Sequence, residues 1–149
     1  MNLRMHAHKV NPAAYQTMMK LEETVKQMNG DPILFELVKI RASQINGCAF
    51  CVDMHTKDLR KLGESEERMS LIVVWRETPL FTEKERAALA LTEAVTQISK
   101  DGVPQELYDE VRKHFNETEF ISLIMAINVI NNWNRIAIST GMFPGCYDN

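Results

Sequence analysis

Apolar residues recur at three- and four-residue intervals over most of this chain, which is the spacing of an amphipathic helix. Prolines and glycines interrupt the pattern, whereas the alternation typical of strands is almost absent. We therefore predict an all-α domain of six or seven helices. The expected helices run from Pro12 to Met28, from Pro32 to Asn46, from about Cys48 to just before Gly63, from Ser65 through Val73, from Thr82 to about Ser99, from Pro104 to around His114, and from Thr118 to Thr140.

Capping signals support these boundaries. Asn11 and Asp31 each precede a proline, which places a capping side chain directly before the first helical position. Gly47 is a typical helix stop. Two apolar runs near the end of the chain, 121–127 and 136–138, would also suit strands. Their position within a long uninterrupted segment favours a helix.

Composition and charge narrow the class of protein. With 149 residues, 45% of them hydrophobic and 25% charged, the chain suits a single domain, residues 1–149, with a true core. The net charge of −3 gives no reason to expect nucleic acid or an anionic membrane as partner. No apolar run approaches the ~18 residues that span a bilayer, and the N-terminus lacks the apolar stretch of a signal peptide. We therefore expect a cytoplasmic protein.

The three cysteines are an odd number, which argues against a secreted disulfide scaffold. Cys48 and Cys51 form a Cys-x-x-Cys pair, and in a reducing compartment such a pair is typically catalytic or metal-binding. Cys146 has no neighbouring base or cation in the sequence that would activate it. We interpret Cys146 as inert.

Four residues carry most of the possible chemistry of this chain: Glu36, Cys48, Cys51 and His55. If Cys48 begins a helix, the two cysteines lie one turn apart on one face, and His55 lies one turn further along. A tight turn at Gly47 would make an antiparallel helical hairpin and bring Glu36 beside His55. We expect Glu36 to hold the imidazole in one tautomer and to stabilise its cation, directly or through a water.

The thiolate is the reactive form of a cysteine, and two arguments select different nucleophiles. A helix N-terminus favours the anion of Cys48. His55 favours Cys51 instead, because a four-residue step brings these two together while Cys48 lies about 10 Å away along the axis. We give more weight to His55, because a general base both creates the thiolate and can protonate a leaving oxygen.

Residues 41–57 resemble, at nearly every position, the alkylhydroperoxidase D-like core of the carboxymuconolactone decarboxylase family. The resemblance continues through 75–79, 82–90 and 132–135, so it spans most of the chain. It implies an all-helical fold and assembly into homo-oligomers, often trimers or hexamers.

The same resemblance implies a thiol peroxidase. In such an enzyme Cys51 attacks a hydroperoxide, Cys48 resolves the sulfenic acid, His55 is the base and Glu36 belongs to the proton relay. An external dithiol, in relatives a lipoyl-bearing protein, would reduce the resulting disulfide. We expect no bound cofactor and no metal. One departure is Phe50, which stands where the best-characterised branch has a histidine, so we expect a shorter relay and weaker turnover.

Three alternatives stay open. A disulfide reductase would use the same four residues. A Cys-x-x-Cys pair followed by one histidine could also hold zinc, although the chain has no second Cys/His pair. In a helical oligomer without turnover, the cysteines would simply be small buried hydrophobes.

Polar residues interrupt the apolar pattern of the last predicted helix. Buried amides need hydrogen-bond partners, so this patch would either bond across a subunit contact or form a half-exposed face. The patch consists of Asn128, Asn131, Asn132, Asn134 and Arg135.

Overall fold

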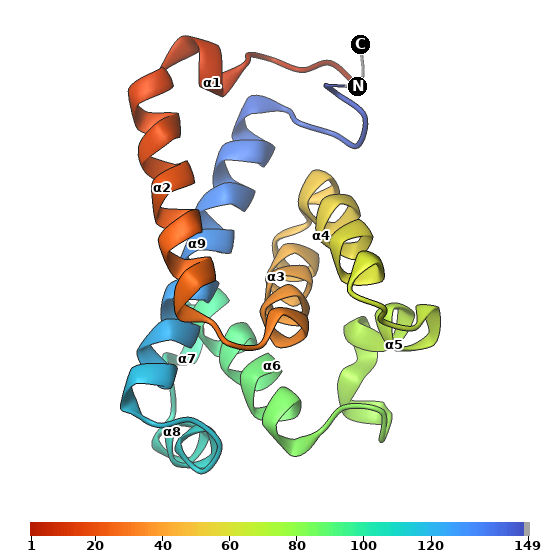
Figure 1. Ribbon diagram of the computed structural model, residues 1–149, viewed down its shortest axis with the longest axis vertical. Helices are drawn as coiled ribbons and strands as arrows, with labels where there is room; N and C mark the ends of the chain where they lie inside the picture. Colours follow the sequence, from red (N-terminus) through yellow and green to blue (C-terminus); the bar gives the residue numbers. More distant parts are fainter. Residues whose placement is uncertain (148–149) are drawn as a thin grey trace.

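The computed structural model describes residues 1–147, which form nine α-helices and one 3₁₀-helix and contain no strand (Figure 1). The predicted all-α fold is confirmed. The elements are α1 (Ala7–Val10), α2 (Pro12–Met28), α3 (Pro32–Asn46), α4 (Ala49–Lys61), α5 (Glu66–Leu71), η1 (Ile72–Glu77), α6 (Glu83–Thr96), α7 (Ile98–Asp101), α8 (Gln105–Arg112) and α9 (Glu117–Thr140).

The seven helices expected from the sequence correspond to α2 to α6, α8 and α9. The single-turn helices α1 and α7 are absent from the prediction, because four residues contain no repeat of the apolar spacing. The helix expected through Val73 ends at Leu71 and continues as the 3₁₀ turn η1. Val74 has non-helical dihedrals within η1, and this kink lets Trp75 turn into the core.

Helix α3 lies at the centre of the molecule and packs against α4, α6 and α9 (Figure 1). Helix α2 packs along α9, and α8 packs against α6 and α9. The N-terminus and the segment that follows α9 lie at the end of the molecule where α4 begins (Figure 1). The start of α4 is therefore close to the N-terminus and to this segment.

The central position of α3 explains its composition. All residues from Leu34 to Ile40 are buried, so α3 has no solvent-facing stripe. Two of these buried residues, Glu36 and Lys39, are charged. Because ionised side chains are rarely buried without partners, the two mark a polar site inside the helical core.

Packing of α9 into the core gives a direct test of the fold. The side chain of Ile127 is fully buried among residues of α3, α6 and α8, whereas Ile138 on the same helix is 45% exposed. We expect Ile127→Ala to lower the free energy of unfolding by about 2–5 kcal/mol through lost burial and a residual cavity. Ile138→Ala is the matched control, with an expected change within about 0.5 kcal/mol. Urea unfolding curves measure both, and equal effects would contradict this packing.

The turn between α3 and α4 closes the helical hairpin that places the cysteines. Gly47 adopts the left-handed conformation (φ 70°), its N–H donates to the Gln44 carbonyl, and the Cys48 N–H donates to the Ser43 carbonyl at 2.9 Å. These two bonds end α3 in a Schellman motif. Helix α4 begins at once, with Cys48 as its N-cap residue. The tight antiparallel hairpin expected from the sequence is therefore present.

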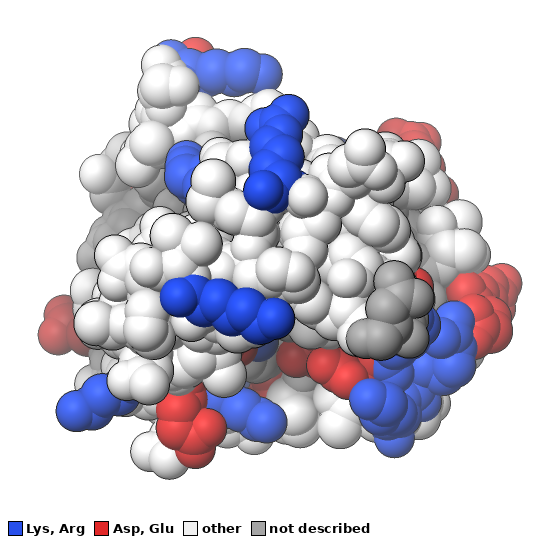
Figure 2. All heavy atoms as spheres, turned by 90° about the horizontal axis from the view of Figure 1, so that it is seen from above, with Lys and Arg blue, Asp and Glu red and all other residues white. Residues whose placement is uncertain are grey.

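None of the helices within residues 1–147 is both long enough and apolar enough to cross a membrane. Figure 2 views the molecule from the end that carries the N-terminus. Much of this face is uncharged, with a few Lys and Arg side chains spread over it and the acidic groups nearer its edges. This face therefore shows no large block of charge of one sign.

Candidate active site

The hairpin brings Glu36 of α3 and His55 of α4 together. His55 Nδ1–H donates a hydrogen bond of 2.7 Å to Glu36 Oε2, and both side chains are almost entirely buried. An ionised carboxylate can only accept, so this bond fixes the proton of a neutral ring on Nδ1 and leaves Nε2 as the free acceptor. The sequence prediction that these two residues meet is confirmed geometrically.

The two cysteines lie at the start of α4, on the face that packs against α9. Each is only 2% exposed, and their sulfur atoms lie 2.7 Å apart. The contacting residues include Ala42 and Ile130, with Phe50 and Met142 at the edge. A disulfide requires a sulfur separation of about 2.05 Å, so a small side-chain adjustment would close the bond.

The two sulfurs share a hydrogen bond that separates their pKa values. We assign Cys51 as the donor, because Cys48 caps the helix N-terminus, where an anion is favoured. The hydrogen bond from Cys51 lowers the pKa of Cys48 to about 7, against the opposing effect of burial, and Asn134 contributes in the same direction. The bond to Cys48, together with burial and the nearby Cys48 charge, raises the pKa of Cys51. Of the two thiols, Cys48 is therefore the one that ionises more readily.

The rate at which the thiols of Cys48 and Cys51 are alkylated should therefore depend on pH. Because its pKa is lowered to about 7, we expect the alkylation rate of Cys48 by iodoacetamide to rise about fivefold from pH 6 to 7 and to level off above pH 8. An ordinary thiol, with a pKa near 8.5, would still gain reactivity up to pH 9. Peptide-resolved mass spectrometry separates Cys48 from Cys51 and Cys146. A midpoint above pH 8 at Cys48 would contradict this arrangement.

His55 makes no direct hydrogen bond with the thiols. Among the hydrogen bonds of residues 1–147, none joins its ring to either sulfur. Proton transfer between His55 and Cys51 therefore requires a bridging water or a small movement of the side chain. The expectation that Cys51 is the nucleophile stays a prediction.

Asparagines of α9 form hydrogen bonds with the end of α3, directly before the turn that leads to the cysteines. Asn134 is fully buried and donates to Ser43 Oγ at 3.0 Å, and Asn46 donates to the side-chain oxygens of both Asn131 and Asn134 at 2.9 Å. Asn131 also donates to Thr96. The two buried asparagines therefore have their hydrogen-bond partners within the chain, and a subunit contact of the exposed Asn128, Asn132 and Arg135 stays a prediction.

A buried ion pair that the sequence analysis did not anticipate lies behind Glu36. The ammonium of Lys39 contacts a carboxylate oxygen of Glu22 on α2 and lies 3.7 Å from Glu36 Oε1. Trp133 Nε1–H on α9 donates to the other oxygen of Glu22 at 3.1 Å. The signal in the sequence was a lysine within the apolar run of α3.

An open groove of ≈ 730 Å³ runs beside the first cysteine. Cys48 lines it, together with the apolar side chains of Val52 and Val73 and the polar side chains of Gln44 and Thr56, whereas Cys51 does not. Cys48 is therefore the cysteine that borders this groove, although only 2% of its surface is exposed.

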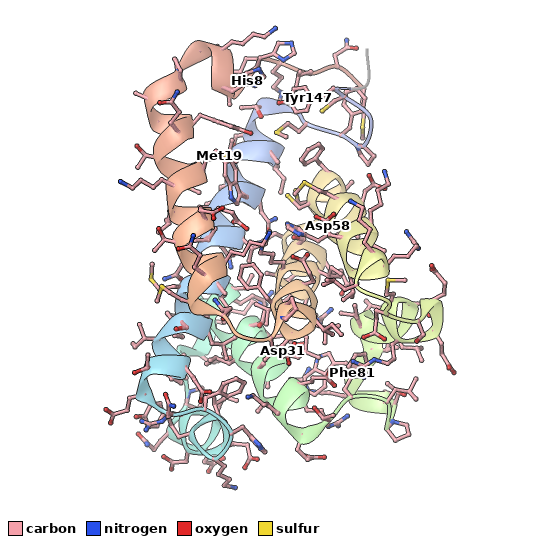
Figure 3. The ribbon with its side chains drawn as sticks, viewed as in Figure 1. His8, Met19, Asp31, Asp58, Phe81 and Tyr147 are labelled. Carbon is pink, nitrogen blue, oxygen red and sulfur yellow. The ribbon has the colours of Figure 1, made fainter. Side chains whose placement is uncertain are left out.

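The C-terminal segment covers the other side of the cysteine helix. The ring of Tyr147 lies edge-on to Phe50 and close to His8, with centroid separations of 6.1 and 5.8 Å (Figure 3). Phe50, which replaces the histidine of the best-characterised branch, is therefore part of an aromatic contact between the start of α4 and the chain ends. Cys146 is partly exposed and is not paired with another cysteine.

One corner of the site has the composition of a metal site. Glu36, His55 and Asp58 offer three potential ligand atoms within 4.8 Å of one another; Asp58 is labelled on α4 in Figure 3. The carboxylates of Glu36 and Asp58 each have a lysine beside them already. Lys39 lies 3.7 Å from Glu36, and Lys61 pairs with Asp58 at 2.8 Å. Of the zinc ligands considered from the sequence, His55 belongs to this group and the two cysteines do not.

An all-helical domain with a Cys-x-x-Cys pair at the start of a central helix is the architecture of alkylhydroperoxidase D-like proteins. Residues 12–94 match the model of the carboxymuconolactone decarboxylase family, and the chain belongs to that family.

Similar proteins extend this assignment over almost the whole chain. The chain is 44% identical, over 95% of its length and 96% of the relative, to the uncharacterised protein YdfG of Bacillus subtilis. A crystal structure from Agrobacterium tumefaciens, of a protein of unknown function assigned provisionally to antioxidant defence as AhpD, has 43% identity and a TM-score of 0.92. That match covers 94% of this chain and 96% of the other.

The same fold also supports other chemistry. The debrominase Bmp8, solved in complex with a tribromopyrrole, has a TM-score of 0.81 at 18% identity over 90% of this chain and 72% of its own. At this identity the comparison shows a shared fold alone.

Proposed function

We propose that this protein is a thiol-dependent alkyl hydroperoxide reductase in which Cys48 and Cys51 cycle between dithiol and disulfide. The observation that carries the proposal is a buried pair of sulfurs 2.7 Å apart, with the Glu36–His55 hydrogen bond on the same helical hairpin. The relative from Agrobacterium tumefaciens, provisionally an antioxidant defence protein, supports the same chemistry.

In the first step the sulfur of Cys51 attacks the distal oxygen of the hydroperoxide. A sulfur–oxygen bond forms, the oxygen–oxygen bond breaks, and an alkoxide leaves. The thiol proton of Cys51 passes through a water to His55 Nε2 and from there to the alkoxide, which departs as the alcohol. Glu36 stabilises the transient imidazolium through the bond to Nδ1.

In the second step Cys48 attacks the sulfenic acid of Cys51. A disulfide forms, and the hydroxide that leaves takes up a proton to become water. The lowered pKa of Cys48 suits this role, because its thiolate is present at pH 7 and lies 2.7 Å from the sulfur it attacks. The lowered pKa of Cys48 thus assists the resolving step directly.

In the third step an external dithiol reduces the disulfide. Its thiolate attacks Cys48, the cysteine that borders the open groove, and Cys51 leaves and takes up a proton. The second thiol of the reductant then displaces Cys48 and becomes a disulfide itself. The scheme requires a reducing compartment such as the cytosol, and the reductant of relatives, a lipoyl-bearing protein, remains the predicted donor. We also propose a homo-oligomer, as the family resemblance implies.

A second candidate function is disulfide exchange without peroxide. The groove-facing Cys48, with a pKa of about 7, favours it, because such a thiolate would attack a disulfide presented by a partner. The two functions differ in their oxidant. A hydroperoxide oxidises the pair in the first case, and a disulfide substrate does so in the second.

Consumption of cumene hydroperoxide distinguishes these functions. Reduced protein without an added thiol should consume about one equivalent per chain and then stop, since each chain has one Cys48–Cys51 pair. Excess dithiol should convert this single turnover to continuous consumption. Failure to consume the first equivalent, together with rapid reduction of a model disulfide, would replace the peroxidase proposal with disulfide exchange.

A further inference from the structure

We infer that Lys39 is a positioning residue of this site: its buried ammonium holds Glu36 as the carboxylate that fixes His55. The inference rests on the proposed function for its effect on turnover, and it adds to that function a residue that touches neither sulfur nor peroxide. It is carried by a chain of contacts that connects four helices.

Lys39 is as deeply buried as the cysteines, with 3% of its surface exposed. Its ammonium lies 3.8 Å from the centre of the Phe35 ring, contacts Glu22 directly, and stands 3.7 Å from the Glu36 oxygen that His55 does not use. Every polar neighbour of this ammonium is therefore a carboxylate or an aromatic face, as a retained positive charge requires.

The charges of Glu22, Lys39 and Glu36 show what Lys39 contributes to the site. Glu22 and Glu36 are two carboxylates brought to one small region inside the protein, and Lys39 lies between them. Without its positive charge, the carboxylate of Glu36 would be buried beside another anion, with His55 as its only partner. Lys39 thus makes the ionised form of Glu36 compatible with burial.

Glu22 fixes the ammonium in place. One of its oxygens contacts Lys39, and the other accepts the Trp133 Nε1–H bond at 3.1 Å. The carboxylate of Glu22 is thereby tied to α9, so Lys39 cannot swing out with it towards solvent. The ordered chain is Trp133, Glu22, Lys39, Glu36 and His55, with contributions from α9, α2, α3 and α4.

A merely structural role is the competing explanation, because the Glu22–Lys39 pair also ties α2 to α3. The variants Glu22→Gln and Glu22→Gln/Lys39→Met separate the two. The glutamine keeps an oxygen for Trp133, and the methionine keeps the length of the lysine without its charge. The double variant therefore leaves no unpaired charge in the outer pair, and only Glu36 loses its cation.

We expect the double variant to fold, with kcat for cumene hydroperoxide at least about tenfold below that of Glu22→Gln and KM within about twofold. Lys113→Met is the matched control, since Lys113 pairs with Glu110 on an exposed helix end far from the site. Its kcat should equal that of the wild type. Equal kcat values for Glu22→Gln and the double variant would overturn the inference and leave Lys39 as a structural partner.

A second measurement needs no turnover. Proton NMR observes the Nδ1–H of His55, a signal identified by its loss in His55→Gln. In wild type and Glu22→Gln this proton should exchange slowly with water, because Glu36 holds it; in the double variant we expect exchange at least about tenfold faster. Should the double variant not fold, Lys39→Met alone is measured in its place, and slow exchange of the His55 proton in that variant would overturn the inference.

These two readouts separate the inference from the proposed function. A wild-type protein that reduces no hydroperoxide but shows the expected exchange pattern would remove the function and keep the role of Lys39. Turnover in the wild type together with slow exchange in the folded double variant would keep the function and remove the role of Lys39.

Discussion

Replacing Cys51 with serine should lower kcat/KM for cumene hydroperoxide by about 10³-fold or more, because a serine hydroxyl cannot take the place of the attacking sulfur. Cys48→Ser should instead permit one turnover and stop at the sulfenic acid of Cys51, since the sulfur that resolves it is 2.7 Å away in the wild type and missing in the variant. Peroxide consumption and dimedone trapping, read by mass spectrometry, measure the two effects.

Cys146→Ser is the matched control for both cysteine variants. Cys146 is unpaired and partly exposed, and its replacement should leave consumption as in the wild type. The reverse pattern, with a trapped sulfenic acid on Cys48 in Cys51→Ser, would exchange the two roles. That result would mean that the resting thiolate of Cys48 also attacks the peroxide.

Glu36→Gln should lower kcat by about 10²-fold or more with little change in fold, because the amide keeps the shape of the carboxylate but not its charge. His55 would lose the partner that stabilises its cation during proton transfer. Stopped-flow peroxide consumption at several pH values measures the loss, and thermal unfolding verifies that the variant is folded.

Glu110→Gln is the control for Glu36→Gln. Glu110 also contacts a histidine, His114, but at 3.5 Å and with nearly half of its surface exposed. Its replacement should not change kcat. If Glu36→Gln turned over as fast as this control, the Glu36–His55 pair would be structural and the relay would have to be abandoned.

The sequence contained enough information for the long helices and for their hairpin. Pro12, Pro32 and Gly47 fix helix ends through local backbone chemistry, so the boundaries of α2 and α3 agree with the prediction. The single turns α1 and α7 and the kink at Val74 depend on packing against the rest of the molecule, and no local pattern predicts them.

The site was predictable to the extent that helical spacing defines it. One hairpin connects Glu36 to His55, so counting residues about its turn was sufficient. Lys39 and Asn134 gain their partners from α2 and from the turn before α4, which are distant in sequence. Such partners follow only from the tertiary fold.

Which of the two thiols ionises more readily was the feature that the sequence predicted least well. The four-residue step from Cys51 to His55 favoured Cys51 as the thiolate, yet the structure shows no bond between these side chains. The helix N-terminus and the hydrogen bond from Cys51 favour ionisation of Cys48 instead and lower its pKa. The cysteine variants described above therefore decide which of the two sulfurs attacks the peroxide.

The mass of the intact protein after one equivalent of cumene hydroperoxide tests the redox cycle most directly. The account predicts that the reduced chain loses two hydrogen atoms, that digestion locates this loss in a Cys48–Cys51 disulfide, and that a dithiol restores the original mass. An unchanged mass, or a stable added oxygen on the wild-type chain with both sulfurs still separate, would contradict it.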